Sequence, residues 1–127
     1  MATDWQEEFL ERCCDSGDGS AMGEGAFAPG PALWVGRREV AHFDDERTLD
    51  VRLTKAVIQL RRVELKSDGR TTLRQRTSDW LHIAIRSEGD AEWARRIVLD
   101  AVEANLPTAA PGLPPVGADL ERRRRFH

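Results

Sequence analysis

The spacing of apolar residues changes along this chain, and the changes predict its helices and strands. Trp5, Phe9 and Cys13 recur every four residues, which predicts an amphipathic helix over residues 4–14. Later in the chain, a stripe with the i, i+3, i+4, i+7 spacing predicts a second helix that ends near Pro107. The residues of this stripe are Ala94, Ile97, Val98, Ala101 and Val102. Each helix has one apolar face that must be buried against a core.

Between these helices, the apolar residues follow the two-residue period of β-strands. Strands are predicted over residues 32–35, 39–43, 49–53, 71–75 and 79–86. A further helix over residues 55–66, capped by Thr54, follows the third strand. Its expected apolar side consists of Ala56, Val57, Leu60 and Val63. The order of elements predicts an α+β fold, in which a single antiparallel sheet of about five strands is packed by two or three helices.

Two segments have compositions that disfavour a packed structure. Residues 15–31 are rich in glycine, and we expect a flexible loop there. Residues 107–127 begin with a proline-rich linker and include the run Arg122 to Arg125, which we expect to form a disordered or extended tail. Residues 1–106 are therefore assigned to one α+β domain, which is long enough for a single hydrophobic core.

Composition and charge restrict the class of protein. The 127 residues are 40% hydrophobic and carry a net charge of −3, which disfavours nucleic acid as a partner. The Arg122 to Arg125 run still leaves contact with phosphates or with a protein partner open. Cys13 and Cys14 are adjacent and match no disulfide framework, which indicates reduced thiols and a cytoplasmic location. No leader or run of about 18 apolar residues is found, so we expect no membrane association.

A β-hairpin is predicted over residues 39–53. Pairing Phe43 with Leu49 places His42 opposite Asp50. The side of the hairpin that faces the core then carries Ala41, Phe43, Leu49, Val51 and Leu53, with Glu39 at its rim. The opposite side carries Val40, His42, Asp50 and Arg52. Alternation in the strand over residues 79–86 adds two further side chains to this second side, those of Trp80 and His82.

This second side of the sheet carries the candidate site. His42 and Asp50 are the candidate catalytic residues, because a carboxylate opposite an imidazole favours its protonated form and fixes its tautomer. His42 would act as the base. The candidate ligand-binding residues are Arg52, Trp80 and His82. An indole ring can stack on a flat ligand, and a guanidinium can bind a carboxylate or phenolate.

Other interpretations of this face stay open. Cross-strand pairs of histidine, arginine and aspartate also stabilise ordinary exposed sheet faces, by roughly a few tenths of a kcal/mol each. A metal site needs at least three ligands, and the candidates are His42, His82 and Asp50 together with Asp44 or Asp45. We predict neither a metal nor a cofactor, and whether the chain is an enzyme is left open.

Several short segments occur in the order found in a known family. They are Gly36 to Asp44, Leu49 to Leu53, Ser78 to Trp80 and Ile85 to Asp90. Together they resemble the small luciferase-like domain family, which is widespread in actinobacteria and related to fungal luciferase. The resemblance covers roughly residues 32–106 and implies an α+β domain. Fungal luciferases oxygenate a hispidin-type phenolic substrate without an obvious metal or flavin. Many relatives carry a His-Pro-Trp or His-His motif in the strand that corresponds to residues 71–75, which here contains no histidine.

Two functional hypotheses follow from these observations. In the first, the domain binds a small aromatic or anionic organic molecule on the second side of the sheet and acts on it through His42. In the second, the chain is a non-enzymatic interaction module that binds a protein or nucleic acid, partly through Arg122 to Arg125.

Overall fold

The computed structural model describes residues 4–74 and 77–125, in which one antiparallel sheet is packed by helices. The strands are β1 (Ala21–Glu24), β2 (Pro31–Val35), β3 (Arg38–Phe43), β4 (Thr48–Arg52), β5 (Thr71–Leu73) and β6 (Trp80–Ala84). The helices are α1 (Asp4–Asp15), α2 (Lys55–Leu60), α3 (Arg62–Ser67), α4 (Glu88–Asn105) and α5 (Gly117–Arg125). The sheet has six strands in the order β1-β2-β3-β4-β6-β5. The predicted α+β class is confirmed, with one strand more than expected.

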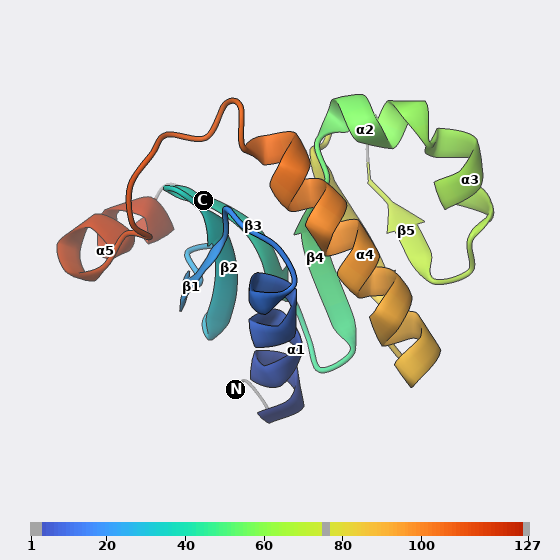
Figure 1. The fold of residues 1–127 in the computed structure, drawn as a ribbon, viewed down its shortest axis with the longest axis horizontal. Helices are drawn as coiled ribbons and strands as arrows, with labels where there is room; N and C mark the ends of the chain where they lie inside the picture. The colour runs from blue at the N-terminus through green and yellow to red at the C-terminus, as the bar shows by residue number, and fades with distance from the viewer. Residues whose placement is uncertain (1–3, 75–76, 126–127) are drawn as a thin grey trace.

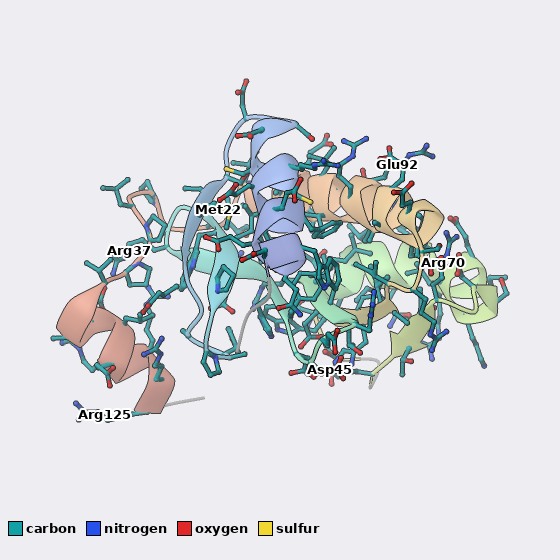
Figure 2. The ribbon with its side chains drawn as sticks, turned by 90° about the horizontal axis from the view of Figure 1, so that it is seen from below. Met22, Arg37, Asp45, Arg70, Glu92 and Arg125 are labelled. Atoms are coloured by element: carbon teal, nitrogen blue, oxygen red, sulfur yellow. The ribbon has the colours of Figure 1, made fainter. Side chains whose placement is uncertain are left out.

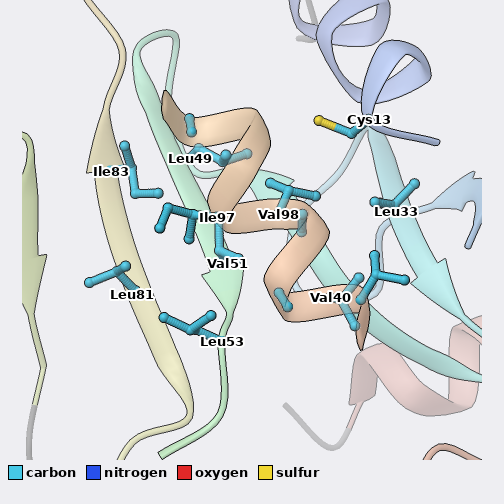
Figure 3. Packing of buried hydrophobic residues seen from close by; sticks show 14 of the residues in the cluster. Cys13, Leu33, Val40, Leu49, Val51, Leu53, Leu81, Ile83, Ile97 and Val98 are labelled. Carbon is cyan, nitrogen blue, oxygen red and sulfur yellow. The ribbon is translucent and has the colours of Figure 1, made fainter. Parts of the chain in front are cut away.

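The main core lies between one face of the sheet and the helices α1 and α4. Figure 1 shows these two helices side by side in front of the central strands, with α2 and α3 next to β5. The whole predicted stripe of α4 is buried, as are Phe9 and Cys13 of α1. Figure 3 shows Ile97 and Val98 of α4 packed among the aliphatic side chains of the sheet. No helix in residues 4–74 and 77–125 is long and apolar enough to span a bilayer.

The register of the hairpin confirms the predicted pairing. Phe43 pairs with Leu49, and His42 pairs with Asp50. On the other side of β4, Asp50 pairs with His82. These cross-strand pairs place an aspartate between two histidines on the face of the sheet opposite α4.

A β-bulge at Val40 corrects the predicted faces of β3. Leu33 pairs with Ala41 and Trp34 pairs with Glu39, so Val40 is an extra residue opposite that step of β2. A bulge places two successive side chains on similar sides of a strand and inverts the alternation beyond it. Val40 therefore packs in the main core, as Figure 3 shows, instead of on the second face. Glu39, expected at the rim of the core, lies on the second face next to His42.

The glycine-rich segment over residues 15–31 is not entirely a loop. Ala21–Glu24 form the edge strand β1, whose pairing with β2 sets Ala21 opposite Trp34. This strand accounts for the additional member of the sheet. It is short and at the edge, and its sequence lacks the alternation that identifies a strand with one buried face.

The helix predicted over residues 55–66 is two short helices, and its expected apolar side is partly wrong. Arg61, with φ −105° and ψ 14°, separates α2 from α3. Ile58 and Leu65 are buried, seven residues apart, whereas Leu60 and Val63 are each 86% exposed. Because α3 packs against the short edge strand β5, there is no broad sheet surface here to cover four apolar side chains.

The C-terminal tail is partly ordered, contrary to the expectation of a disordered or extended segment. Residues 107–116 form no helix or strand, but Gly117–Arg125 form α5. Leu120 of α5 is buried in a second, smaller cluster with Ala26, Ala32 and Trp34. This cluster lies on the second face of the sheet, so α5 and the loop over residues 25–30 cover part of that face.

Candidate functional site

A buried histidine between two carboxylates is the centre of the second face, which we call the His42 cluster (Glu39, His42 and Asp50). Nδ1 of His42 lies 2.7 Å from Oε2 of Glu39. Nε2 of the same ring lies 3.3 Å from Oδ2 of Asp50. The contact with Glu39 is an ion pair, although it lacks the alignment of a hydrogen bond. All three residues are less than 5% exposed.

The surroundings of His42 favour its charged form. Burial alone lowers the pKa of the imidazole, but the contacts with Asp50 and then Glu39 outweigh burial and raise it from 6.5 to about 9. His42 is therefore protonated at neutral pH and bears a positive charge between two negative ones. A protonated ring donates a proton, so the predicted role as a base is available only above about pH 9.

Asp50 also contacts His82 on the adjacent strand β6 and Arg74, which directly follows β5. Its Oδ1 lies 2.8 Å from Nε2 of His82, and its Oδ2 lies 3.3 Å from a guanidinium nitrogen of Arg74. Nε of Arg74 in turn donates to Nε2 of His82 at 2.8 Å. The same imidazole nitrogen accepts from Arg74, so its contact with Asp50 is a close approach without the alignment of a hydrogen bond.

Aromatic rings cover the His42 cluster. The ring of Phe27 is stacked on His42, with centroids 5.9 Å apart and planes at 8°. Trp80 lies 5.2 Å from His42 and meets Phe27 edge-on at 5.0 Å. Arg52 lies over the Trp80 ring at 5.8 Å and pairs with Asp79 at 3.1 Å. The loop over residues 25–30 is tied to the cluster, since the backbone N–H of Ala26 donates to Glu39 at 2.5 Å.

A cleft of about 210 Å³ opens beside this cluster, and we call it the arginine cleft. It is lined by Ala26, Phe27, Trp34, Arg37, Arg38, Glu39, Arg52 and Arg123. Its walls thus combine four guanidinium groups with two aromatic rings and a buried carboxylate. Figure 2 shows Arg37 next to α5, the helix that supplies Arg123.

The four arginines differ in how their charge is balanced. Arg37 pairs with Asp119 of α5, and Arg52 pairs with Asp79. Arg38 donates to Oγ1 of Thr108 at 2.8 Å, a neutral partner. Arg123 donates to the carbonyl of Arg37 at 2.6 Å and lies over the Trp34 ring. Among residues 4–74 and 77–125, no carboxylate forms an ion pair with Arg38 or Arg123.

The two cysteines lie away from this face. Cys13 is buried in the main core, and burial raises the pKa of its thiol to about 12. Cys14 is partly exposed and donates to the carbonyl of Ser20 at 3.4 Å. A nucleophilic role for Cys13 would require a thiolate that does not form at neutral pH.

All five residues predicted from the sequence share the second face, but only Arg52 lines the arginine cleft. The predicted set is His42, Asp50, Arg52, Trp80 and His82, of which His42, Asp50 and Trp80 are buried. The prediction missed Glu39, Phe27, Arg38 and Arg123. No local pattern indicates Phe27 or Arg123, because both reach the site through long-range packing of a loop and of α5.

The family match covers the strands that build the His42 cluster. The model of the Luciferase domain family matches residues 37–101 of the 127-residue chain. The chain belongs to this luciferase domain family. The matched segment runs from the turn before β3 into α4 and contains every member of the His42 cluster. Phe27, Trp34 and Arg123 lie outside the luciferase domain match, so part of the arginine cleft is built by flanking segments. No curated protein and no solved structure matches the chain.

Proposed function

We propose that this member of the luciferase domain family binds a small organic anion with an aromatic body in the arginine cleft. The observation that carries the proposal is the gathering of four arginines around one cleft, two of which have no carboxylate partner among the described residues. Guanidinium groups bind carboxylates and phosphates through paired, charge-assisted hydrogen bonds.

The charges of the cleft favour an anion over a neutral ligand. Burial lowers the pKa of Arg52, Asp79 opposes this effect, and the charge of Arg38 lowers the pKa further. Likewise, burial and then the charge of Arg37 lower the pKa of Arg123. The arginines therefore repel one another, and a bound anion would relieve this repulsion.

The apolar walls and the size of the cleft favour a small aromatic ligand. Phe27 and Trp34 line it, and aromatic faces stack on flat rings. Its volume of about 210 Å³ is below the roughly 300–1,000 Å³ of pockets for drug-sized ligands. An aromatic carboxylate or phenolate of one ring meets both requirements. A chemical step by His42 and Asp50 stays a prediction, because neither residue lines the cleft, whereas their neighbours Phe27 and Glu39 do.

Binding of cinnamate and of its uncharged analogue cinnamamide tests the proposal by calorimetry or by quenching of tryptophan fluorescence. We expect cinnamate to bind at least tenfold more tightly than cinnamamide, because charged hydrogen bonds contribute about 1.5–3 kcal/mol. Arg123→Met should weaken cinnamate binding about tenfold. Arg96→Met is the matched control, since Arg96 is 69% exposed on α4 and remote from the cleft. Equal affinity for the acid and the amide, or equal effects of the two variants, would refute the proposal.

The alternative of an interaction module acting through Arg122 to Arg125 has less support. Arg123 donates to the carbonyl of Arg37, and Arg124 donates to the carbonyl of Gly25 at 3.0 Å. Two of the four side chains are thus engaged within the domain. Binding to phosphate-rich polymers that weakens steeply with salt and survives Arg123→Met would favour this alternative.

A further inference from the structure

We propose that the end of the β3–β4 hairpin binds a divalent transition-metal ion through His42, Asp44 and Asp50. One ligand atom from each of these side chains lies within 4.8 Å of the other two. In a tetrahedral zinc site, with bonds of about 2.0–2.1 Å, the ligand atoms are roughly 3.4 Å apart. The three ligand atoms must therefore come slightly closer to one another to bind zinc. Rotation of the exposed Asp44 side chain can supply this movement.

The strand geometry places the three ligands on one face. His42 lies in β3, and Asp44 directly follows its last residue, Phe43. The backbone N–H of Asp44 donates to the carbonyl of Thr48 at 2.9 Å, so the strand pairing continues to Asp44, and alternate residues of a strand point to the same side. Asp50 is the cross-strand partner of His42. The neighbouring Asp45 is outside this group of ligand atoms, and its Oδ1 accepts from the backbone N–H groups of Arg47 and Thr48 at 2.9 Å. Asp44 thus supplies the third ligand beside His42 and Asp50.

Two further observations favour a cation at this position. Glu39 contacts Nδ1 of His42, which leaves Nε2 directed to Asp50. A metal ion bound at Nε2 would replace the proton on that nitrogen, and this proton would be released to solvent. A carboxylate on the far nitrogen of a histidine is the usual arrangement behind a metal-bound imidazole. In addition, Oδ1 of Asp50 is buried and has no aligned hydrogen-bond donor among the described residues, although Nε2 of His82 lies 2.8 Å away.

The cations that now contact Asp50 do not block the site. The side chain of Arg74 is 44% exposed and can withdraw to solvent. His82 is close enough to Asp50 to act as an outer hydrogen-bonding partner of a bound ion. One imidazole and two carboxylates suit Zn²⁺ or Mn²⁺, whereas Ca²⁺ takes six to eight oxygen ligands. Three protein ligands also leave an open coordination position for water or an anion.

Zinc binding by the full chain, stripped with a chelator, tests the proposal in competition with a chromogenic chelator. We expect one Zn²⁺ per chain and a rise in melting temperature on binding. Asp44→Asn should weaken binding at least tenfold and abolish the rise. Glu46→Gln is the matched control, because it makes the same change of charge in the same turn. Glu46 is exposed and is not one of the three proposed ligands. Since Asp44 is also exposed, its substitution should leave the fold intact.

Binding of Co²⁺ adds a spectroscopic readout that identifies the ligands. Visible d–d absorption without an intense thiolate band is the expected result, and it should be lost in Asp44→Asn. A thiolate band would assign the ion to a cysteine and overturn the proposal. Zinc affinity weaker than about 100 μM, or equal in Asp44→Asn and the parent chain, would also overturn it. Arg123→Met should retain full zinc affinity, so this test is independent of the arginine cleft.

Discussion

Raising the pH from 6 to 10 should destabilise the metal-free protein through the His42 cluster. The pKa of His42 is about 9 in the folded protein and 6.5 in the unfolded chain. Between these values the folded state holds a proton that the unfolded state has lost, so stability falls as the pH rises. The contribution is fully present below pH 6.5 and is lost once the pH has passed 9.

The size of this effect follows from the two pKa values. At about 1.4 kcal/mol for each pKa unit, a change from 6.5 to about 9 corresponds to about 3 kcal/mol. Because His42 is 3% exposed, solvent screens its contacts with Glu39 and Asp50 little. With a denaturant dependence of roughly 1–3 kcal/mol per molar urea, the midpoint of unfolding should fall by about 1–3 M across this range.

Urea unfolding followed by circular dichroism at several pH values, with a chelator present, measures the effect. A parallel NMR titration of the histidine ring protons should give one imidazole with a pKa near 9. His82→Gln is the control, because it removes a neighbouring histidine without removing either carboxylate contact of His42. A free energy of unfolding that stays constant from pH 6.5 to 9, with every histidine titrating below 7, would refute the electrostatic reasoning.

Three further predictions concern the scaffold around the site. Thr54 has φ 80° and ψ 145°, a region of backbone conformation that suits glycine. Thr54→Gly should therefore stabilise the protein by about 1 kcal/mol in urea unfolding, because the backbone strain that is relieved exceeds the few tenths of a kcal/mol lost with the helix cap. Destabilisation would contradict this. Leu120→Ala should cost about 2–3 kcal/mol in the same assay because Leu120 is 3% exposed, whereas Leu113→Ala, at an 80% exposed position, should cost almost nothing. Equal effects would show that α5 does not pack as described. In the folded protein at pH 8, Cys14 should react with a thiol reagent and Cys13 should react only after unfolding; rapid modification of both thiols would contradict the burial of Cys13.

Local patterns predicted the elements whose side chains face a single broad core. The stripe of α4 is long and regular, and its period identifies both the helix and its buried side. The pairing of His42 with Asp50 also followed, because a register error of one residue would have exposed Phe43 and Leu49. These features depend on interactions between residues that are close in the sequence, or on a pattern that is repeated many times.

Features that depend on a single residue or on a distant contact were not predicted. Counting with a period of two cannot detect the extra residue at Val40, so Glu39 was placed on the wrong face. One buried leucine in an arginine-rich segment gives no periodic signal, yet Leu120 brings α5 onto the sheet. Phe27 reaches His42 from a loop whose composition indicates flexibility. The residues of the candidate site that lie on the strands were therefore predicted, whereas the loop over residues 25–30 and α5, which cover them, were not.

The bulge at Val40 has a consequence for how this site can be gained or lost in evolution. Deleting Val40 would remove the bulge and restore regular alternation, and Glu39 would stay opposite Trp34 on the same face as His42. Related domains whose strand is shorter by this one residue should therefore keep the acidic neighbour of His42. A relative that kept the extra residue but paired regularly with the neighbouring strand would instead turn Glu39 towards the core.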